Sequence, residues 1–200
     1  MKSIAQIILL FLTLQYTLAQ TNTYSISFEN AIHHEAVISA TFPEVTTEIF
    51  TVQMSRTSPG RYALHEFAKN IYNFKATDSE GNNLVVTRPN PYQWNISGHD
   101  GTVTISYTLF ADRGDGTYSQ IDETHAHLNI PATFMFSPEF SDRKIEVNFK
   151  PREDLNWKIA TQMPLSNGTT YTAPNLQYFM DSPTELSNFG IREFEVLEKD

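Results

Sequence analysis

Hydrophobic and polar residues alternate with a period of two along much of the chain. The alternation is clearest at 24–28, 36–42 and 48–54, and it returns at 92–97, 102–110, 144–149 and 157–161. Such segments, rich in β-branched and aromatic residues, are typical of strands with one buried face. Segment 189–196 is a further candidate strand. Many short strands and few helices predict an all-β fold, an antiparallel β-sandwich-like domain.

One segment has helical spacing instead. Leu64, Phe67, Ala68 and Ile71 stand at i, i+3, i+4 and i+7, shortly after the turn formers at 58–60. The spacing predicts at most one short helix, near 62–72, with Leu64, Phe67 and Ile71 facing the core. An extended conformation is the alternative.

Two of the predicted strands flank a glycine-containing turn. Gly98-His99-Asp100-Gly101 separates 92–97 from 102–110. Glycine supplies the positive φ angles that tight turns need, so the pattern predicts a hairpin with a four-residue loop.

The first residues have the pattern of an export signal. Lys2 is followed by a mostly apolar stretch at 4–16, and Thr17-Leu18-Ala19 places small residues before a cut at Gln20. This order is typical of a secretory signal peptide, and the stretch is shorter than the roughly 20 residues of a membrane-spanning helix. We expect residues 1–19 to be removed. The mature protein would then be periplasmic, cell-surface or extracellular, with no stable membrane insertion.

Composition excludes several classes of function. The chain has 14 Lys and Arg against 23 Asp and Glu, which gives a net charge of −9. An acidic surface argues against nucleic acid and anionic lipid as partners. The sequence has no cysteine, so it has no thiolate metal site and no cysteine nucleophile. The chain also carries no complete metal-binding or cofactor-binding motif, and we expect no cofactor in it.

The histidines are the first candidates for chemistry. His65-Glu66 begins like the zinc-binding pattern H-E-x-x-H, but Lys69 stands where the second histidine is needed. His125 and His127 would share one face of a strand and could meet one ion or anionic ligand. Without an evident third ligand, two solvated or hydrogen-bonded histidines are the simpler interpretation.

Other motifs are incomplete or ambiguous. The sequence lacks G-x-S-x-G, G-x-G-x-x-G and a P-loop, and the acidic turn at 112–116 lacks the full calcium-loop pattern. Carboxylate pairs for glycoside hydrolysis remain open because their separation is spatial. Tyr92, Trp94 and Tyr107 could form a sugar-stacking face, although core packing is the commoner role of such residues.

Three stretches together resemble a known family. They are MSRTSPGRYALHEFAKN (54–70), DETHAHLNIPATF (122–134) and YFMDSPTE (178–185). They are similar to the N-terminal region of the PDZ-containing glycyl aminopeptidase metallopeptidases (family M sixty-one). The resemblance implies an N-terminal β domain, then a zinc-binding catalytic domain with H-E-x-x-H, then a PDZ domain. No residue here matches the zinc ligands or the general base.

The resemblance implies a domain organisation and a role. We expect an N-terminal β domain at 20–175 and the truncated start of the catalytic domain at 176–200, with zinc in the missing part. By analogy with related aminopeptidases, Thr124, His125 and His127, together with Asp181 and Ser182, would border the active cleft. Asp181 suits an ammonium group, and a turn or helix cap is its alternative role.

We therefore expect the N-terminal β domain of an exported zinc aminopeptidase. It would pack on the catalytic domain, help to bind the peptide N-terminus and be inactive alone. The alternative is a stand-alone secreted β-sandwich module that binds sugar or peptide. A carboxylate-dependent hydrolase is a third possibility, which no motif supports.

Overall fold

The computed structural model describes residues 20–60 and 63–193. Its strands are β1 (Thr21–Ser27), β2 (Glu35–Phe42), β3 (Ile49–Gln53), β4 (Ile71–Thr77), β5 (Val85–Asn90), β6 (Gln93–Ser97), β7 (Val103–Phe110), β8 (Gln120–Ile121), β9 (His125–Leu128), β10 (Lys144–Lys150), β11 (Lys158–Thr161), β12 (Leu165–Asn167), β13 (Thr170–Ala173) and β14 (Thr184–Ser187). The α-helices are α1 (Ile130–Thr133) and α2 (Leu176–Met180), and the 3-10 helices are η1 (Ala31–His33), η2 (Phe67–Asn70), η3 (Pro138–Phe140) and η4 (Glu153–Leu155). The all-β prediction is confirmed.

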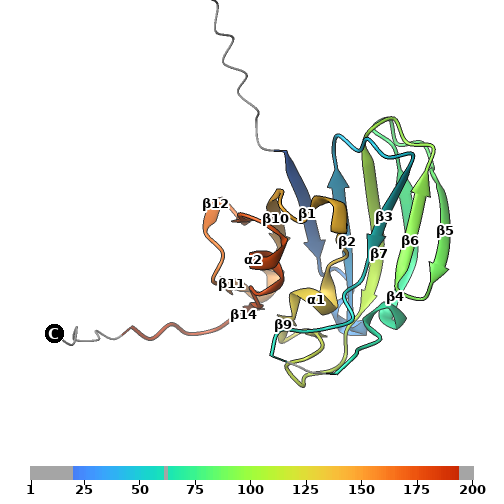
Figure 1. Cartoon of the computed structure of the whole chain (residues 1–200). Helices are drawn as coiled ribbons and strands as arrows, with labels where there is room; N and C mark the ends of the chain where they lie inside the picture. Colours follow the sequence, from blue (N-terminus) through green and yellow to red (C-terminus); the bar gives the residue numbers. More distant parts are fainter. Residues whose placement is uncertain (1–19, 61–62, 194–200) are drawn as a thin grey trace, which may run out of the picture.

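The strands form three sheets. The largest has the order β12-β13-β10-β1-β2-β7-β4, a second has β11-β14-β9-β8, and a third has β3-β6-β5. Within these sheets the pairing is antiparallel except between β1 and β10, which are parallel. Figure 1 shows the three-stranded sheet on one side of the molecule and α2, β11 and β14 on the other, with β1 and β2 between them.

Aromatic side chains join the layers of the core. Phe42 of β2 meets Phe50 of β3 with ring centroids 5.2 Å apart, which links the large sheet to the three-stranded sheet. Tyr24 of β1 contacts Phe134, just after α1, at 5.7 Å and Phe179 of α2 at 5.3 Å. All five rings are buried. Burial of large rings is a main source of stability in a chain without disulfides.

The predicted hairpin at 98–101 is wrong. Gly98 and Gly101 do have positive φ angles of 86° and 103°, as the turn required. However, β6 pairs with β3 and β5, whereas β7 pairs with β2 and β4. The loop therefore crosses from one sheet to another, because β6 forms its hairpin with the preceding strand β5 and β7 pairs with strands of the large sheet.

The short helix expected near 62–72 is a 3-10 helix, η2. Phe67 is buried as predicted, and Ile71 begins β4 and is partly buried; Ala68 is buried as well. Leu64 is 67% exposed, so its predicted place in the core is wrong. It precedes η2 and therefore does not share a helical face with Phe67.

The predicted strand at 189–196 does not form within the described residues, because 189–193 have no strand conformation. The rest of that segment, and the signal peptide expected at 1–19, lie outside the described residues. The division at residue 175 stays a prediction. Within the described part of 176–200, α2 buries Phe179 in the common core, and β14 lies between β11 and β9.

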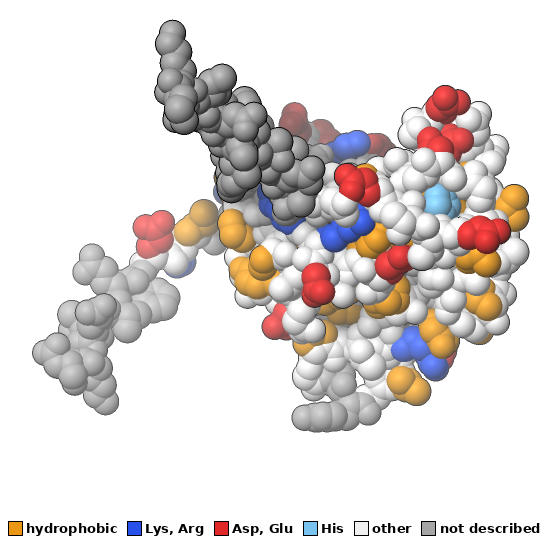
Figure 2. Space-filling view, turned by 45° about the horizontal axis from the view of Figure 1, so that its top comes forward, with side chains coloured by type: hydrophobic (Ala, Val, Ile, Leu, Met, Phe, Trp, Pro, Cys, Tyr) orange, Lys and Arg blue, Asp and Glu red, His pale blue; other side chains and the backbone are white. Residues whose placement is uncertain are grey.

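The acidic side chains do not gather in one patch on the face that Figure 2 shows; they are scattered over it. None of the helices among the described residues has the length and apolarity needed to cross a membrane.

Candidate functional site

The two sequence-predicted histidines lie on β9, in the interior of the four-stranded sheet. The register pairs His127 with Gln120 of β8 and with Glu185 of β14, and it pairs His125 with Ser187. Paired residues lie on the same face of a sheet, and alternate residues of one strand share a face. The five polar side chains therefore lie on one face. The opposite face is apolar and buried, with Ile121, Ala126, Leu128 and Leu186.

This polar face forms a groove, here called the β9 groove. It has a volume of about 540 Å³ and is lined by Gly114, Gly116, Gln120, His125, His127, Glu185 and Ser187. Gly114 allows Gln120 to pack closely, because a Cβ at Gly114 would overlap Oε1 of Gln120. The acidic turn at 112–116 thus forms a wall of the groove. Asp115 caps this turn by accepting hydrogen bonds from the backbone N–H groups of Thr117 and Tyr118.

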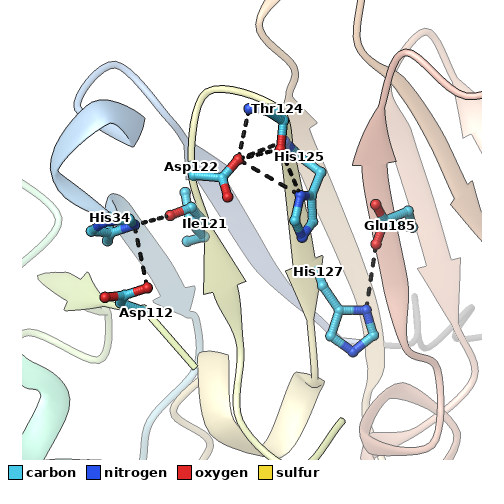
Figure 3. Close-up of polar contacts among 8 residues, drawn as sticks. All are labelled: His34, Asp112, Ile121, Asp122, Thr124, His125, His127 and Glu185. Atoms are coloured by element: carbon cyan, nitrogen blue, oxygen red, sulfur yellow. Dashed lines mark hydrogen bonds and ion pairs between the residues drawn. The ribbon is translucent and has the colours of Figure 1, made fainter. Parts of the chain in front are cut away.

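His127 and Glu185 form a pair across β9 and β14. Nδ1 of His127 lies 3.4 Å from Oε2 of Glu185, and both side chains are about one-third exposed, at 35% and 36%. Figure 3 shows the imidazole ring turned toward the carboxylate. The pair is open to solvent, so its charge is partly screened and its effect on stability is small.

His125 is held by a second carboxylate. Thr124 Oγ1 donates a 2.5 Å hydrogen bond to Asp122 Oδ1 and lies 3.0 Å from Nδ1 of His125. Burial raises the pKa of Asp122, but hydrogen bonds from the Thr124 hydroxyl and from the N–H groups of Thr124 and His125 outweigh it, so the pKa lies below its usual value. Asp122 is therefore an ionised anchor for the turn before β9.

A third histidine connects the large sheet to β8. His34 has a left-handed backbone (φ 62°), and its Nδ1 donates a 2.7 Å hydrogen bond to the carbonyl of Ile121. Oδ1 of Asp112 lies 3.7 Å from the same nitrogen. Figure 3 shows Ile121 and Asp122 between His34 and the two β9 histidines. It does not line the β9 groove, and its contacts join two sheets.

Asp181 and Ser182 lie at the other end of β14. Thr184 pairs with Leu128, whereas Ser187 pairs with His125, so the chain enters β14 from the end remote from His125. Asp181 is exposed and caps the end of α2. Ser182 is buried, donates to the Tyr178 carbonyl at 2.6 Å and accepts from Gln162 at 3.0 Å. These contacts match the alternative of a turn and cap, and neither residue lines the groove.

The other candidates have structural partners. His65 stacks on Phe67 with centroids 5.1 Å apart, and Glu66 forms a 3.0 Å ion pair with Arg56. Trp94 and Tyr107 are buried and have the core role rather than that of a sugar-stacking face. Among residues 20–60 and 63–193, no group of three His, Asp or Glu side chains could hold a metal ion. The described residues therefore do not fit a zinc site.

The three stretches that carry the family resemblance pack together. Asn129 donates a 3.0 Å hydrogen bond to Ser58, which ties 54–70 to 122–134. Phe179 meets Phe134 with ring centroids 5.2 Å apart, which adds 178–185. A second cavity of about 550 Å³ lies where they meet, lined in part by Ser58, Pro131 and Met180.

Sequence reasoning missed Gln120, Glu185 and Ser187 as groove residues. Glu185 lies in the third of the stretches that carry the family resemblance. The sequence does not indicate a strand there, because 184–187 is too short to show an alternation of hydrophobic and polar residues. The register of β14 on β9, which local sequence does not encode, places Glu185 beside His127.

Comparison with known proteins agrees with this architecture. The family model for the Peptidase M61 N-terminal domain matches residues 23–188. A crystal structure of an aminopeptidase N family protein from Idiomarina loihiensis is similar, with a TM-score of 0.82 and 23% identity over 87% of this chain and 30% of that chain. An M1 zinc metallopeptidase from Deinococcus radiodurans is a more distant neighbour, with a TM-score of 0.45 and 9% identity over 84% of this chain and 41% of that chain. No curated protein matches the chain.

The fold and the family match define an N-terminal β domain of the kind found in metallopeptidases. The chain belongs to the Peptidase M61 N-terminal domain family, whose model covers most of its length. It spans less than a third of the Idiomarina structure.

Proposed function

We propose that this chain is the non-catalytic N-terminal β domain of an exported, zinc-dependent aminopeptidase of the glycyl aminopeptidase type. It packs on a catalytic domain and helps to bind the N-terminus of a peptide substrate. The family match over residues 23–188 carries the proposal. The lack of a metal-ligand group among the described residues is compatible with it, because the zinc and the general base would belong to a following domain.

The substrate-binding part of the proposal concerns the region of β9. Thr124, His125 and His127 are proposed to border the cleft. Asp181 and Ser182 belong to the same proposed group but are less favoured. Support comes from the groove that His125 and His127 line. Asp181 and Ser182 lie outside that lining, and Ser182 is buried.

The reading frame that follows the codon for Asp200 provides the first test. We expect it to encode H-E-x-x-H and a downstream glutamate within the next domain length. A frame without that motif would contradict the peptidase proposal and favour the stand-alone module that binds sugar or peptide. With the motif present, the full-length protein should release N-terminal residues from peptides only when loaded with zinc, and residues 20–193 alone should release none.

Export has a separate test. The full chain, produced with its own leader in a secreting host, should begin at Gln20 when its N-terminus is sequenced. Retention of Met1 on a cytoplasmic product would contradict the proposed export.

A further inference from the structure

A pocket between strands β4 and β5 combines an unpaired arginine with an aromatic wall. It has a volume of about 340 Å³ and is lined by residues 71–74 of β4, by Val86 and Arg88 of β5, and by Trp94 of β6. We propose that this pocket, here called the β4–β5 pocket, binds a carboxylate that is joined to an aromatic ring, with Arg88 holding the carboxylate. The pocket shares no lining residue with the β9 groove, so the inference does not depend on the proposed function.

The pocket lies between two edge strands that do not pair with each other. β4 is the last strand of the seven-stranded sheet, and β5 is the last strand of the three-stranded sheet. The N–H of Leu84 donates a 2.9 Å hydrogen bond to the carbonyl of Ala76, which holds the chain together at the connection between the two strands. Beyond that connection β4 pairs with β7, and β5 pairs with β6. Figure 1 shows β4, β5 and β6 on the same side of the molecule.

A β-bulge places Phe74 in the wall of this pocket. The register of β4 on β7 shifts between Tyr72 and Lys75, so Asn73 and Phe74 stand opposite one residue of β7. Asn73 has a φ angle of 55°, a left-handed conformation that residues other than glycine seldom adopt. Phe74 stacks on Trp94 with ring centroids 5.3 Å apart. Bulges often redirect a side chain beside a functional site, and this bulge directs an aromatic ring toward the pocket.

Arg88 is the charged residue of the pocket lining. Its guanidinium carbon lies 4.2 Å from the ring centroid of Trp94, and its Nη2 donates to the carbonyl of Pro91. The arginine ion pairs among the described residues are made by Arg56, Arg113 and Arg152. Arg88 therefore has no carboxylate partner within that part of the chain. A guanidinium matches a carboxylate through two parallel N–H···O bonds, so the complement of this pocket is a carboxylate.

The rest of the lining favours an aromatic group beside that carboxylate. Phe74 and Trp94 supply rings, and Val86 supplies an aliphatic side chain from β5. The volume is near the lower end of the roughly 300–1,000 Å³ of ligand pockets, which suits one ring. The hydroxyl of Tyr72 already donates to Glu35. A sugar acid would bring several hydroxyl groups to a lining with few polar partners, whereas an aromatic acid loses no such hydrogen bonds.

An added β-strand does not suit this pocket. Pro89 lies within β5 and has no N–H to donate, and the bulge interrupts the regular ladder of β4. Both features hinder the pairing of a strand edge with another chain. A ligand of the pocket therefore uses side chains rather than backbone ladders.

The experiment records NMR spectra of the whole chain with labelled tryptophan. The chain has two tryptophans, and Trp157 packs on Phe28 outside the pocket, so its indole signal is an internal control. Phenylacetate and N-acetyl-phenylalanine should each give a saturable shift of the Trp94 indole signal. N-acetyl-phenylalaninamide, which has no carboxylate, and acetate, which has no ring, should give none at the same concentrations. Tighter binding of N-acetyl-phenylalanine would assign the site to a C-terminal aromatic residue, and tighter binding of phenylacetate to a free aromatic acid.

Two variants test the role of Arg88. Arg88→Gln should weaken the binding of phenylacetate about tenfold or more, because a charge-assisted pair of hydrogen bonds is lost. Lys75→Gln is the matched control, since Lys75 is an exposed cation of β4 outside the pocket lining, and it should bind like the wild type. Arg88 is exposed, so R88Q should fold, and an unchanged Trp157 signal checks this.

The proposal is overturned if neither aromatic acid gives a saturable shift of Trp94, which would leave the bulge and Arg88 with the role of protecting strand edges. It is also overturned if R88Q binds as well as the wild type, if K75Q weakens binding as much as R88Q, or if the amide binds as well as the acid. Tighter binding of glucuronate than of both aromatic acids would overturn the assignment to an aromatic carboxylate.

Discussion

Tyr107 makes two buried hydrogen bonds in the core. Its hydroxyl donates to the carbonyl of Thr133 and accepts from the N–H of Met135, both at 2.9 Å, and its side chain is 1% exposed. The contact joins β7 to the end of α1, which follows β9 directly. Tyr107→Phe would leave both backbone groups buried without a partner.

The expected loss follows from those two groups. An unsatisfied buried donor or acceptor costs about 1–3 kcal/mol, so the two groups left by Y107F should lower the free energy of unfolding by about 2–6 kcal/mol. For a domain of this size, the loss corresponds to a melting temperature lower by about 4–24 °C. Urea unfolding followed by fluorescence measures the first quantity, and calorimetry measures the second.

Tyr24 supplies the matched control. It is also buried, at 4% exposure, but its hydroxyl makes no hydrogen bond with the described residues, and burial alone raises its pKa. Tyr24→Phe should change the free energy of unfolding by less than about 0.5 kcal/mol. If Y107F proved as stable as Y24F, the two hydrogen bonds would not carry the assigned energy, and the reasoning would be refuted.

Three further predictions concern the C-terminal segment, the acid response and the groove. Phe179→Ala should lower the free energy of unfolding in urea by about 3–5 kcal/mol, because the ring is fully buried. Gln177→Ala should leave this free energy nearly unchanged, because Gln177 is exposed. Equal effects of the two substitutions would mean that α2 does not belong to the core. The pKa of Asp122 is lower in the folded state than in the unfolded state. The contribution of this carboxylate to the stability of the fold is therefore complete above the unfolded pKa of about 4, and it is lost as the pH falls through the lower folded pKa. The difference in stability between wild type and Asp122→Asn should therefore shrink below about pH 4, and a difference that grows would contradict this. Gly114→Ala should displace the side chain of Gln120 and shift its amide NMR signals. The free energy of unfolding should fall by less than about 1 kcal/mol, because only the end of a flexible side chain must move. Unchanged amide signals would contradict the close packing of Gln120 on Gly114.

The sequence predicted local features well. Strands with clean alternation, such as β1, β2 and β7, lie where the pattern placed them, because one face of each is buried. Several strands were missed: β4, β5, β8, β12, β13 and β14. β5 has largely exposed side chains, and β14 is only four residues long, so neither shows a clear period.

The sequence by itself determined the all-β class, the sharing of one strand face by His125 and His127, and the three stretches that resemble the family. These depend on the order of side chains along a few residues. The tertiary structure alone decided that 98–101 crosses between sheets, that Asp181 lies outside the groove and that Glu185 faces His127. Strand pairing depends on packing between segments far apart in the chain, and the carboxylate of the groove is set by that pairing.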